Sequence, residues 1–574
     1  MAIEGNWESR RVEAVSRMGE IDRRRFVALT GASAAALIFG YGTSTEKVWA
    51  RPAFSGYPFR LGVASGDPEP DGVVLWTRLA PEPLADNGFS GMPKDGAVEV
   101  RWEVAKDEGF RRTVREGTTM ARPRLGHSVH VEVSGLLPNR EYFYRFRAGD
   151  ATSPVGRTKT APAPGTSLAE MSFAFVSCQQ YEHGYFTAYR RLSEEDLDLV
   201  VHLGDYIYEY GPNEYRAPGG NVRVHEGGEI TTLAAYRRRH AQYRSDRDLR
   251  AAHAAFPFLV TWDDHEVENN YADEIPESGQ SPEAFLRRRA AAYQAYYENM
   301  PLRRRSVPRG PDILLYRRLA YGDLAEFNIL DTRQYRDDQA ADDGTDPPNP
   351  GQQDPGRTLT GEEQERWLLD GLAASGATWN VLAQQVFFAQ RDFQIGAGQR
   401  FSMDAWDGYI GSRDRISNFI LEGDIQNPVV LTGDVHNNWA CDLKADYDDQ
   451  TSETFGVEFV GTSVTSGGDG ADTSAGQQAT VAENPHIKFF NGQRGYVRCT
   501  LTPETWRADY RVVPYVSQPG APVYTRASFV TQAGNPGLVP VEENPVQGTR
   551  SSETAIESDV ERATAQREAD LKRR

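Results

Sequence analysis

Cysteine and positive charge are both scarce in this chain of 574 residues. Its three cysteines, Cys178, Cys441 and Cys499, are too few for a disulfide-stapled scaffold. If Cys178 binds a metal, the sequence leaves open whether Cys441 and Cys499 pair. The 63 Lys and Arg residues stand against 82 Asp and Glu, a formal net charge of -19. Because a nucleic-acid backbone is bound by clustered basic side chains, this balance argues against nucleic acid as a partner.

Long apolar runs are also missing. Residues 22–40, DRRRFVALTGASAAALIFG, form a weakly apolar run that is too short to span a bilayer, so no transmembrane anchor is expected in the mature chain. Arg23 to Arg25 precede this run, and small residues before Arg51 offer a cleavage site. The segment resembles a twin-arginine signal. We therefore expect residues 1–50 to engage the twin-arginine export machinery, and the protein to be secreted, periplasmic or cell-wall associated. The alternative is a basic cap on an ordinary amphipathic helix.

The remaining chain is long enough for two domains, and its patterning changes once. Residues 57–162 hold four alternating segments, 73–79, 98–104, 129–136 and 141–148, which predict a small all-β sandwich of fibronectin or immunoglobulin type. The approach to Tyr142 resembles a tyrosine corner. A Pro- and Ala-rich link at 160–167 predicts the boundary. Residues 170–540 alternate strand and helix patterns, which predicts a layered α/β domain. Residues 541–574 read as a mobile tail or a surface helix.

Several elements of the large domain are expected from periodicity. Helices are predicted over 185–197, 233–253, 281–299 and 360–374, and strands over 324–331, 378–388 and 456–463. Thr360 and Glu363 have the spacing of a capping box at the start of the last helix.

Four further apolar stretches each end on a possible metal ligand. They are MSFAFVSC ending at Cys178, LDLVVHLGD at Asp205, FPFLVTWDDH at Asp264 and His265, and NPVVLTGDVH at Asp434 and His436. Such runs are typical of buried strands in an open α/β sheet, where ligands gather beyond the carboxyl ends of the strands. We therefore expect the four ends to converge on one metal site, which makes a hydrolase the leading hypothesis.

The residue types indicate which metals would suit this site. Asp205 has two oxygens with which to bridge cations, and Tyr208, three residues later, is able to turn toward the same site. Tyr is a poor ligand while neutral, so a trivalent iron is the cation that would hold it as tyrosinate. A thiolate at Cys178 also favours iron over magnesium. The alternative for Cys178 is a small buried hydrophobe.

Two short clusters complete the predicted set. Three carboxylates and His265 stand within residues 263–266, which is hard to explain on an apolar strand without cations, unless the run is exposed. His265 is placed to contact a substrate oxygen or protonate a leaving group. Asp434 and His436 would point to the same side if the chain there is extended.

The ordered motifs SCQQ, HLGDYIYEY, TWDDHEVENNY, LDTRQYR, WDGY and LTGDVHNNW, behind the predicted sandwich, resemble those of PhoD-type alkaline phosphatases. That family is related to purple acid phosphatases and calcineurin-like metallophosphoesterases. The resemblance implies a β-sandwich flanked by helices, a ferric ion (Fe3+) with calcium (Ca2+) neighbours, and hydrolysis of phosphate monoesters and some diesters outside the cytoplasm. Cys178, Asp205 and Tyr208 would be iron-side ligands, Asp205 would also touch calcium, and Asp264, Asp434 and His436 would complete the cluster.

The expected mechanism is attack on phosphorus by a metal-activated hydroxide or oxide, with Asp205 and His265 as catalytic residues. Asn269, Asn270, Asn437 and Arg333 are candidate substrate contacts, although Arg333 would serve equally as an ion-pair partner of Asp331 or Asp337. Substrates are expected to be small phosphate esters, with phospholipid or teichoic-acid-like diesters as further candidates. Two alternatives remain: a phosphodiesterase or phospholipase-D-like enzyme on the same metals, and a secreted binding protein with structural metal sites.

Overall fold

The computed structural model describes residues 48–49, 53–277 and 279–545, which fall in one compact unit. The predicted export signal, apart from two residues, and the tail beyond residue 545 lie outside this part of the chain. Within the described residues, no helix has the length and apolar character needed to cross a membrane.

A ten-stranded sheet runs through most of the described chain. At its centre β10, β11, β12 and β2 are parallel, and the strands on both sides are antiparallel. In spatial order its strands are β25 (Asn535–Glu543), β24 (Tyr524–Gln532), β23 (Thr505–Val513), β22 (Arg494–Leu501), β10 (Met171–Val176), β11 (Leu199–Leu203), β12 (Pro257–Thr261), β2 (Val63–Glu69), β3 (Gly72–Arg78) and β6 (Ser128–Val133).

A seven-stranded sheet packs against the first. Its strands, in order, are β13 (Arg317–Tyr321), β14 (Ala325–Ile329), β16 (Trp379–Ala383), β18 (Pro428–Thr432), β20 (Thr454–Val460), β19 (Asn438–Lys444) and β21 (Ile487–Asn491). Fully buried side chains such as Phe173 and Leu203 of the first sheet join Phe327 and Leu431 of the second in one apolar core. The four apolar stretches, which resembled strands of one open sheet, are divided between the two sheets: β10, β11 and β12 share the first, whereas β18 belongs to the second. Fully apolar strands look alike in either sheet, so the sequence did not separate the two.

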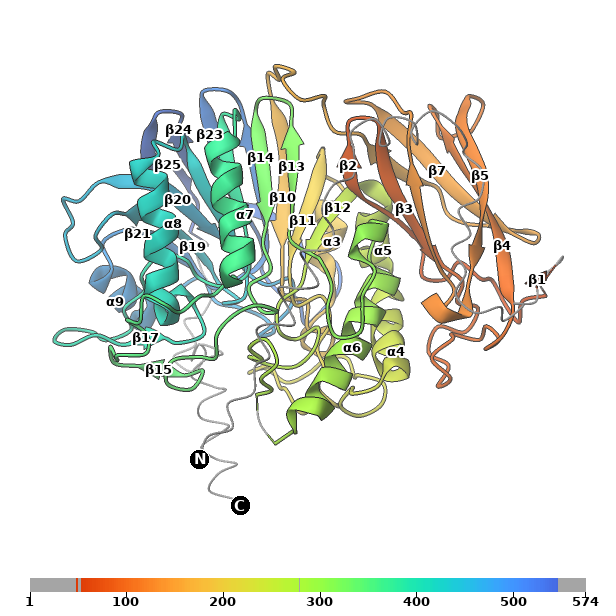
Figure 1. Ribbon diagram of the computed structural model, residues 1–574, viewed down its shortest axis with the longest axis horizontal. Helices are drawn as coiled ribbons and strands as arrows, with labels where there is room; N and C mark the ends of the chain where they lie inside the picture. Colours follow the sequence, from red (N-terminus) through yellow and green to blue (C-terminus); the bar gives the residue numbers. More distant parts are fainter. Residues whose placement is uncertain (1–47, 50–52, 278, 546–574) are drawn as a thin grey trace, which may run out of the picture. The chain divides into compact units, whose positions relative to one another are not determined.

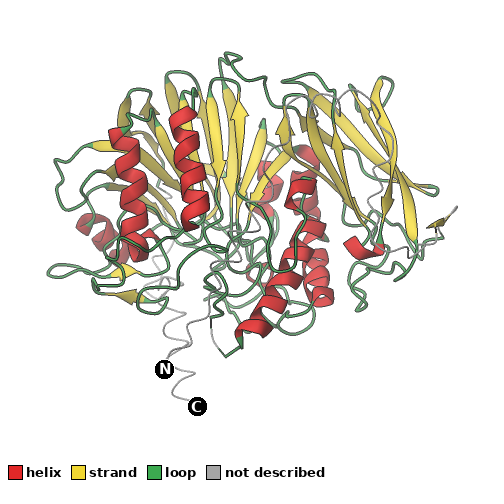
Figure 2. Cartoon of the chain, in the orientation of Figure 1, coloured by secondary structure: helices red, strands yellow, loops and turns green. Residues whose placement is uncertain are grey.

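Helices cover the outer faces of both sheets (Figure 1). The first sheet packs against α3 (Thr187–Leu192), α4 (Leu233–Arg244), α5 (Arg247–Ala255) and α6 (Pro282–Asn299), and the second against α7 (Gly361–Ala374) and α8 (Ile410–Glu422). A further helix, α9 (Ala475–Glu483), lies beside β21. Figure 2 shows the resulting order of layers, helices outside and strands within. The predicted layered α/β sandwich is confirmed.

Helices depart from the sequence prediction in three places. The helix predicted over 185–197 is shorter, because α3 spans only Thr187–Leu192. The segment 233–253 is two helices, because α4 ends at Arg244 and Asp246 caps α5 by accepting hydrogen bonds from the backbone of Asp248 and Leu249. The capping box at Thr360 was wrong, since the Thr360 side chain makes no capping hydrogen bond. Thr358 instead accepts the Gly361 N–H at 2.9 Å.

The N-terminal strands form a sandwich that shares a sheet with the rest of the chain. One side is a six-stranded sheet of β1 (Val48–Trp49), β4 (Ala97–Ala105), β5 (Thr113–Ala121), β7 (Glu141–Ala148), β8 (Ala151–Thr152) and β9 (Gly156–Lys159). The other side is β2, β3 and β6 of the ten-stranded sheet, joined to it by the pairing of Ser65 with Pro257 in β12. As in a tyrosine corner, the Tyr142 hydroxyl accepts the Leu137 N–H at 2.9 Å.

Candidate metal centre

The predicted ligands follow the ends of four buried strands, but the backbone turns sharply at most of them. Cys178, Asp205, Asp434 and His436 all have φ between 56° and 60°, the left-handed region that non-glycine residues avoid. The condition under which Asp434 and His436 would point to the same side, an extended segment, is not met, because β18 stops at Thr432. Such strained positions are typical of sites where side-chain placement matters more than local stability.

The first group of donors joins both sheets. A donor atom of Cys178, one of Asp205 and one of His436 all lie within 4.8 Å of one another, and all three residues are buried. The Tyr208 hydroxyl lies 2.8 Å from Asp205 Oδ2 and 3.2 Å from His436 Nε2, so it belongs to the same group. Sulfur, carboxylate, phenol and imidazole thus lie close to one another.

The second group shares Asp205 with the first. Donor atoms of Asp205, Asp264 and His265 lie within 4.8 Å of one another, again all buried. A carboxylate common to both groups is placed to bridge two cations. Asp434 belongs to neither group of three and is half-buried, although its charge helps raise the pKa of the Cys178 thiol.

The pKa shifts and unpaired oxygens of these buried donors indicate whether they could accommodate cations. Burial raises the pKa of Asp205 well above its usual value, and Asp264 and Asp263 add to the effect despite His265. The pKa values of Tyr208 and Cys178 are raised as well. Burial is the larger cause for each, and the negative charge of Asp205 is the second. Oδ1 of Asp205 and Oδ1 of Asp264 have no hydrogen-bond partner among the described residues. Buried acids with unused oxygens are costly unless cations meet them, so the donor set fits metal ions.

His265 is held by a carboxylate that the sequence reading did not single out. Its Nδ1 lies 2.8 Å from Glu209 Oε2, and both side chains are buried. Burial acts to lower the pKa of His265, but Asp264, Glu209 and Asp205 together raise it well above its usual value. Glu209 also accepts the Asn269 N–H at 2.8 Å, which ties the segment after β12 to the segment after β11.

Arg333 is engaged by carboxylates other than the predicted ones. Its guanidinium is fully buried, 2.6 Å from Asp263 and in a two-pronged pair with Asp404 at 2.7 and 2.8 Å. Asp331 instead accepts the Arg333 backbone N–H. Of the two alternatives for Arg333, the ion-pair role is therefore the one observed, but its partners are not Asp331 or Asp337. The segment after β14 thus braces the one after β12.

The three asparagines border the donor groups. The Asn270 backbone N–H donates to Asp264 at 2.7 Å, and its side chain donates to Asp343. The side chain of Asn269 donates to Glu277, and that of Asn437 donates to the carbonyl of Val435. A substrate contact by any of them stays a prediction.

Two further residues support the centre: Glu266, from the carboxylate cluster predicted at 263–266, and Ser466, which the sequence analysis did not single out. Glu266 accepts backbone N–H groups of Asp205, Tyr206 and Asp263, joining two strand ends, and burial raises its pKa to about 8. Ser466 Oγ lies 2.7 Å from the Tyr208 hydroxyl and donates to the Cys178 carbonyl. A signal existed for Ser466, since Ser-Gly-Gly soon after a strand marks a tight loop.

The other two cysteines do not form a disulfide. Cys441 and Cys499 are free and buried, and they belong to different apolar cores. Burial raises the pKa of each thiol well above its usual value, as expected for inert structural cysteines.

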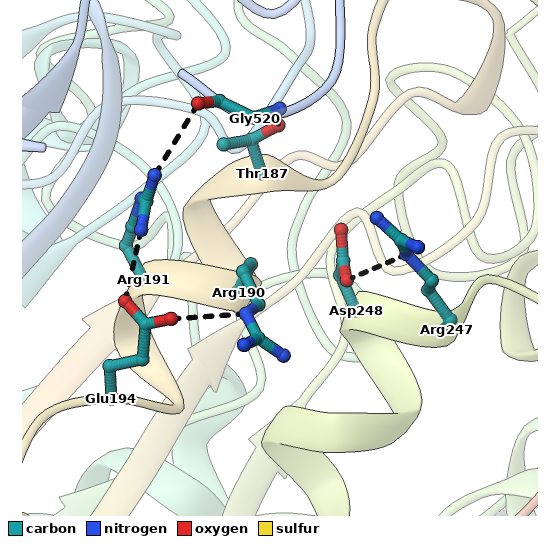
Figure 3. A pocket seen from close by; sticks show the side chains of 7 residues that line it. All are labelled: Thr187, Arg190, Arg191, Glu194, Arg247, Asp248 and Gly520. Carbon is teal, nitrogen blue, oxygen red and sulfur yellow. Dashed lines mark hydrogen bonds and ion pairs between the residues drawn. The ribbon is translucent and has the colours of Figure 1, made fainter. Parts of the chain in front are cut away.

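A separate surface hollow of about 420 Å³ shares no residue with the two donor groups (Figure 3). It is lined by Thr187, Arg190, Arg191, Glu194, Arg247, Asp248 and Gly520. Glu194 pairs with Arg190 and Arg191, and Asp248 pairs with Arg247, so the charges of this hollow are largely matched within it.

Comparisons with known proteins agree with this geometry. The model of the PhoD-like phosphatase family matches residues 173–510, and that of the PhoD-like phosphatase N-terminal domain matches residues 44–162. Alkaline phosphatase D of Bacillus subtilis (strain 168) is 59% identical over 556 residues, covering 96% of this chain and 95% of that protein. A solved structure described as PhoD superposes with a TM-score of 0.87 at 60% identity, covering 91% of this chain and all of the other. The chain therefore belongs to the PhoD-like phosphatase family and is a phosphoric ester hydrolase.

Proposed function

We propose that this protein is an exported, metal-dependent alkaline phosphatase that hydrolyses phosphate monoesters, and diesters as well, at the two donor groups joined by Asp205. The observation that carries the proposal is the shared carboxylate: buried Asp205 lies in both groups, and its Oδ1 has no hydrogen-bond partner among the described residues. The alternative of a binding protein is not carried forward, because the family is one of phosphoric ester hydrolases.

Cys178, Asp205, Tyr208 and His436 would hold a ferric ion, and Asp205 and Asp264 would hold calcium. Asp434, which lies in neither donor group, is added as a calcium ligand from the family resemblance alone. Thiolate and phenolate suit iron, whereas carboxylate oxygens suit calcium. When bound, these cations supply Lewis-acid activation of water and neutralise charge on the phosphoryl group.

The side chains of the protein would position the reacting groups and transfer the proton. Asp205 orients the site from its strained position after β11, while Glu266 holds the backbone on either side of it. Glu209 accepts the Nδ1 proton of His265, which directs Nε2 toward the leaving oxygen, where His265 donates a proton. Arg333 holds Asp263 and Asp404, and so acts as a positioning residue.

Substitution of Asp205 by Asn tests the proposal. We expect Asp205→Asn to lower kcat/KM for a phosphate monoester by more than about 100-fold, because a neutral amide cannot replace a bridging carboxylate. Asp442→Asn is the matched control, since Asp442 is a half-buried carboxylate of β19 that pairs with Lys488. Activity retained in Asp205→Asn would refute the assignment.

Metal analysis with a visible spectrum tests the choice of cations. Purified protein should contain iron and calcium, and the iron should give a visible charge-transfer band that is lost in Tyr208→Phe and Cys178→Ser. A colourless, iron-free protein with full activity would contradict the ferric assignment. The kcat/KM values for a monoester, a diester and a phospholipid, measured in parallel, decide between the phosphatase and the alternative phosphodiesterase or phospholipase-D-like enzyme.

The leader is assigned from sequence alone. Export should stop when Arg23, Arg24 and Arg25 are replaced by Lys, which keeps the charge but removes the arginines that resemble the export motif. Fractionation of cells that carry this variant is the measurement, and unchanged export would contradict the proposal.

A further inference from the structure

A group of aromatic rings lies beside the candidate metal centre. The ring of Tyr208 lies 4.2 Å from that of His265, and the ring of Tyr210 lies 5.4 Å from it. Tyr215 lies beyond both tyrosines, with ring centroids 6.2 Å from Tyr208 and 5.4 Å from Tyr210. Tyr208 is buried, whereas Tyr210 and Tyr215 are half-buried, so part of the surface of each reaches solvent. The group therefore runs from the proposed proton donor to the protein surface.

Tyr215 is held in place by its backbone. Its carbonyl accepts a hydrogen bond from the side chain of Asn221 at 3.0 Å and lies 3.2 Å from His183 Nε2. His183 Nδ1 accepts the Gly467 N–H, so the proton is on Nε2 and that nitrogen donates to Tyr215. The His183 ring also meets the Tyr215 ring edge-on at 4.6 Å. The orientation of Tyr215 is thus fixed from two sides.

The loop that carries Tyr215 is anchored by one buried acid. Glu182, which has no exposed surface, accepts the backbone N–H groups of Asn213 and His225 at 3.1 Å and the side chain of Asn221 at 3.3 Å. Segments before and after Tyr215 are therefore tied to the same carboxylate. This matters because a fixed ring binds a ligand without a large loss of conformational entropy.

We propose that Tyr210 and Tyr215 form a subsite for the leaving group of the ester and make the enzyme select aryl over compact alkyl phosphates. The inference rests on the proposed function, in which His265 protonates the leaving oxygen. The substituent on that oxygen would lie on the His265 side of the phosphorus, beside Tyr210, whose ring is 5.4 Å from that of His265, with the Tyr215 ring 5.4 Å beyond Tyr210. A flat substituent gains stacking there that a short polyol does not.

The test compares 4-nitrophenyl phosphate with glycerol 1-phosphate on the full-length, metal-loaded protein. The quantity measured is the ratio of the two kcat/KM values. Tyr215→Ala should lower this ratio about fivefold, the size expected from loss of one aromatic contact. Tyr215→Leu keeps apolar bulk without a ring and should lower the ratio as well, which guards against a folding defect in the Ala variant. Tyr215→Phe keeps the ring and should keep the ratio.

Tyr316→Ala is the matched control, because Tyr316 is a half-buried tyrosine that packs on Trp367. It should leave the ratio at the wild-type value. The inference is overturned if Tyr215→Ala and Tyr215→Leu keep the wild-type ratio while the wild type turns over both esters and Asp205→Asn does not. The proposed function, by contrast, fails if Asp205→Asn remains active or if the wild type hydrolyses neither ester.

Discussion

Four of the proposed ligands occupy a backbone conformation that costs L-residues roughly 1–2 kcal/mol each. Cys178, Asp205, Asp434 and His436 share this feature, and each directly follows a strand or lies one turn beyond it. The chemistry of these residues made them predictable from sequence, whereas the left-handed backbone at each of them was not predicted. Apolar patterning reports where a strand is buried and says little about the φ of the residue that follows it.

Gly204, which precedes Asp205, tests how tightly this turn is built. Its φ is 111°, and an added Cβ would lie 2.6 Å from Cβ of Asp263. Gly204→Ala should lower the free energy of unfolding by about 3 kcal/mol, from backbone strain and steric overlap together. It should also lower the iron content, because the overlap displaces the segments that carry Asp205 and Asp264. Denaturant unfolding and metal analysis are the measurements.

Gly310→Ala is the control for this substitution. Gly310 also has a positive φ, 71°, but nothing lies within 4 Å of an added Cβ. Its substitution should cost only about 1 kcal/mol, the strain of the backbone alone. Equal losses for the two variants would show that the turn at Gly204 is not sterically tight.

At the level of elements, ion pairs join loops that follow different strands. Arg333, after β14, bridges Asp263, after β12, and Asp404, which lies between β17 (Phe401–Ser402) and α8. The Arg333 and Arg336 side chains lower the pKa of Asp404 below its usual value against the effect of burial. The two sheets thus contribute to one site through an ion-pair network.

Removal of Arg333 should therefore be costly. Arg333→Met leaves buried Asp263 without its cation and removes one of the two arginines that pair with Asp404, so it should lower the free energy of unfolding by about 3–5 kcal/mol. The control is Arg415→Met, because Arg415 is partly exposed and pairs with Glu365, so its loss should cost less than about 1 kcal/mol. Urea denaturation at pH 8 compares them. A loss at Arg333 no larger than that at Arg415 would contradict the bracing role.

The sequence predicted the bounds of individual helices and strands better than it predicted which strands pair or which distant side chains interact. β7 spans the predicted 141–148, and α6 begins after Ser281 as expected. Strand pairing is non-local, so nothing within β18 indicates that it joins the second sheet. Likewise, the sequence around Arg333 contains Asp331 and Asp337, but its partners lie about 70 residues away on either side. Side-chain networks between distant loops follow from packing, which no local pattern encodes.

At the level of the whole molecule, all ten histidines are buried. Burial lowers the pKa of most of them below the usual value; for example, it lowers the pKa of His130 and His486 to about 4 and that of His240 to about 3. The unfolded chain therefore takes up protons near pH 6.5, before the folded chain does. Stability is full above that pH and is lost as pH falls through 6.5 toward the lower folded values.

His240 provides a specific test of this pH dependence. Neither of its ring nitrogens has a hydrogen-bond partner within the described residues, so Phe is a reasonable replacement. Between pH 6.5 and 5, the loss of unfolding free energy should be smaller in His240→Phe than in the wild type by up to about 1.4 kcal/mol per pH unit. At pH 8 the two should depend on pH alike. Urea unfolding over this range is the measurement, and identical slopes would contradict the prediction.

The pairing of β2 with β12 bears on how this protein can be divided. A fragment that began after residue 162 would keep β12 but lose β2, which hydrogen-bonds to it through Ser65 and Gly66. The unpaired amide and carbonyl groups along β12 would then be free to hydrogen-bond with strands of other chains, which promotes aggregation. The N-terminal strands are thus not a detachable accessory, and we expect the phosphatase to fold as one unit.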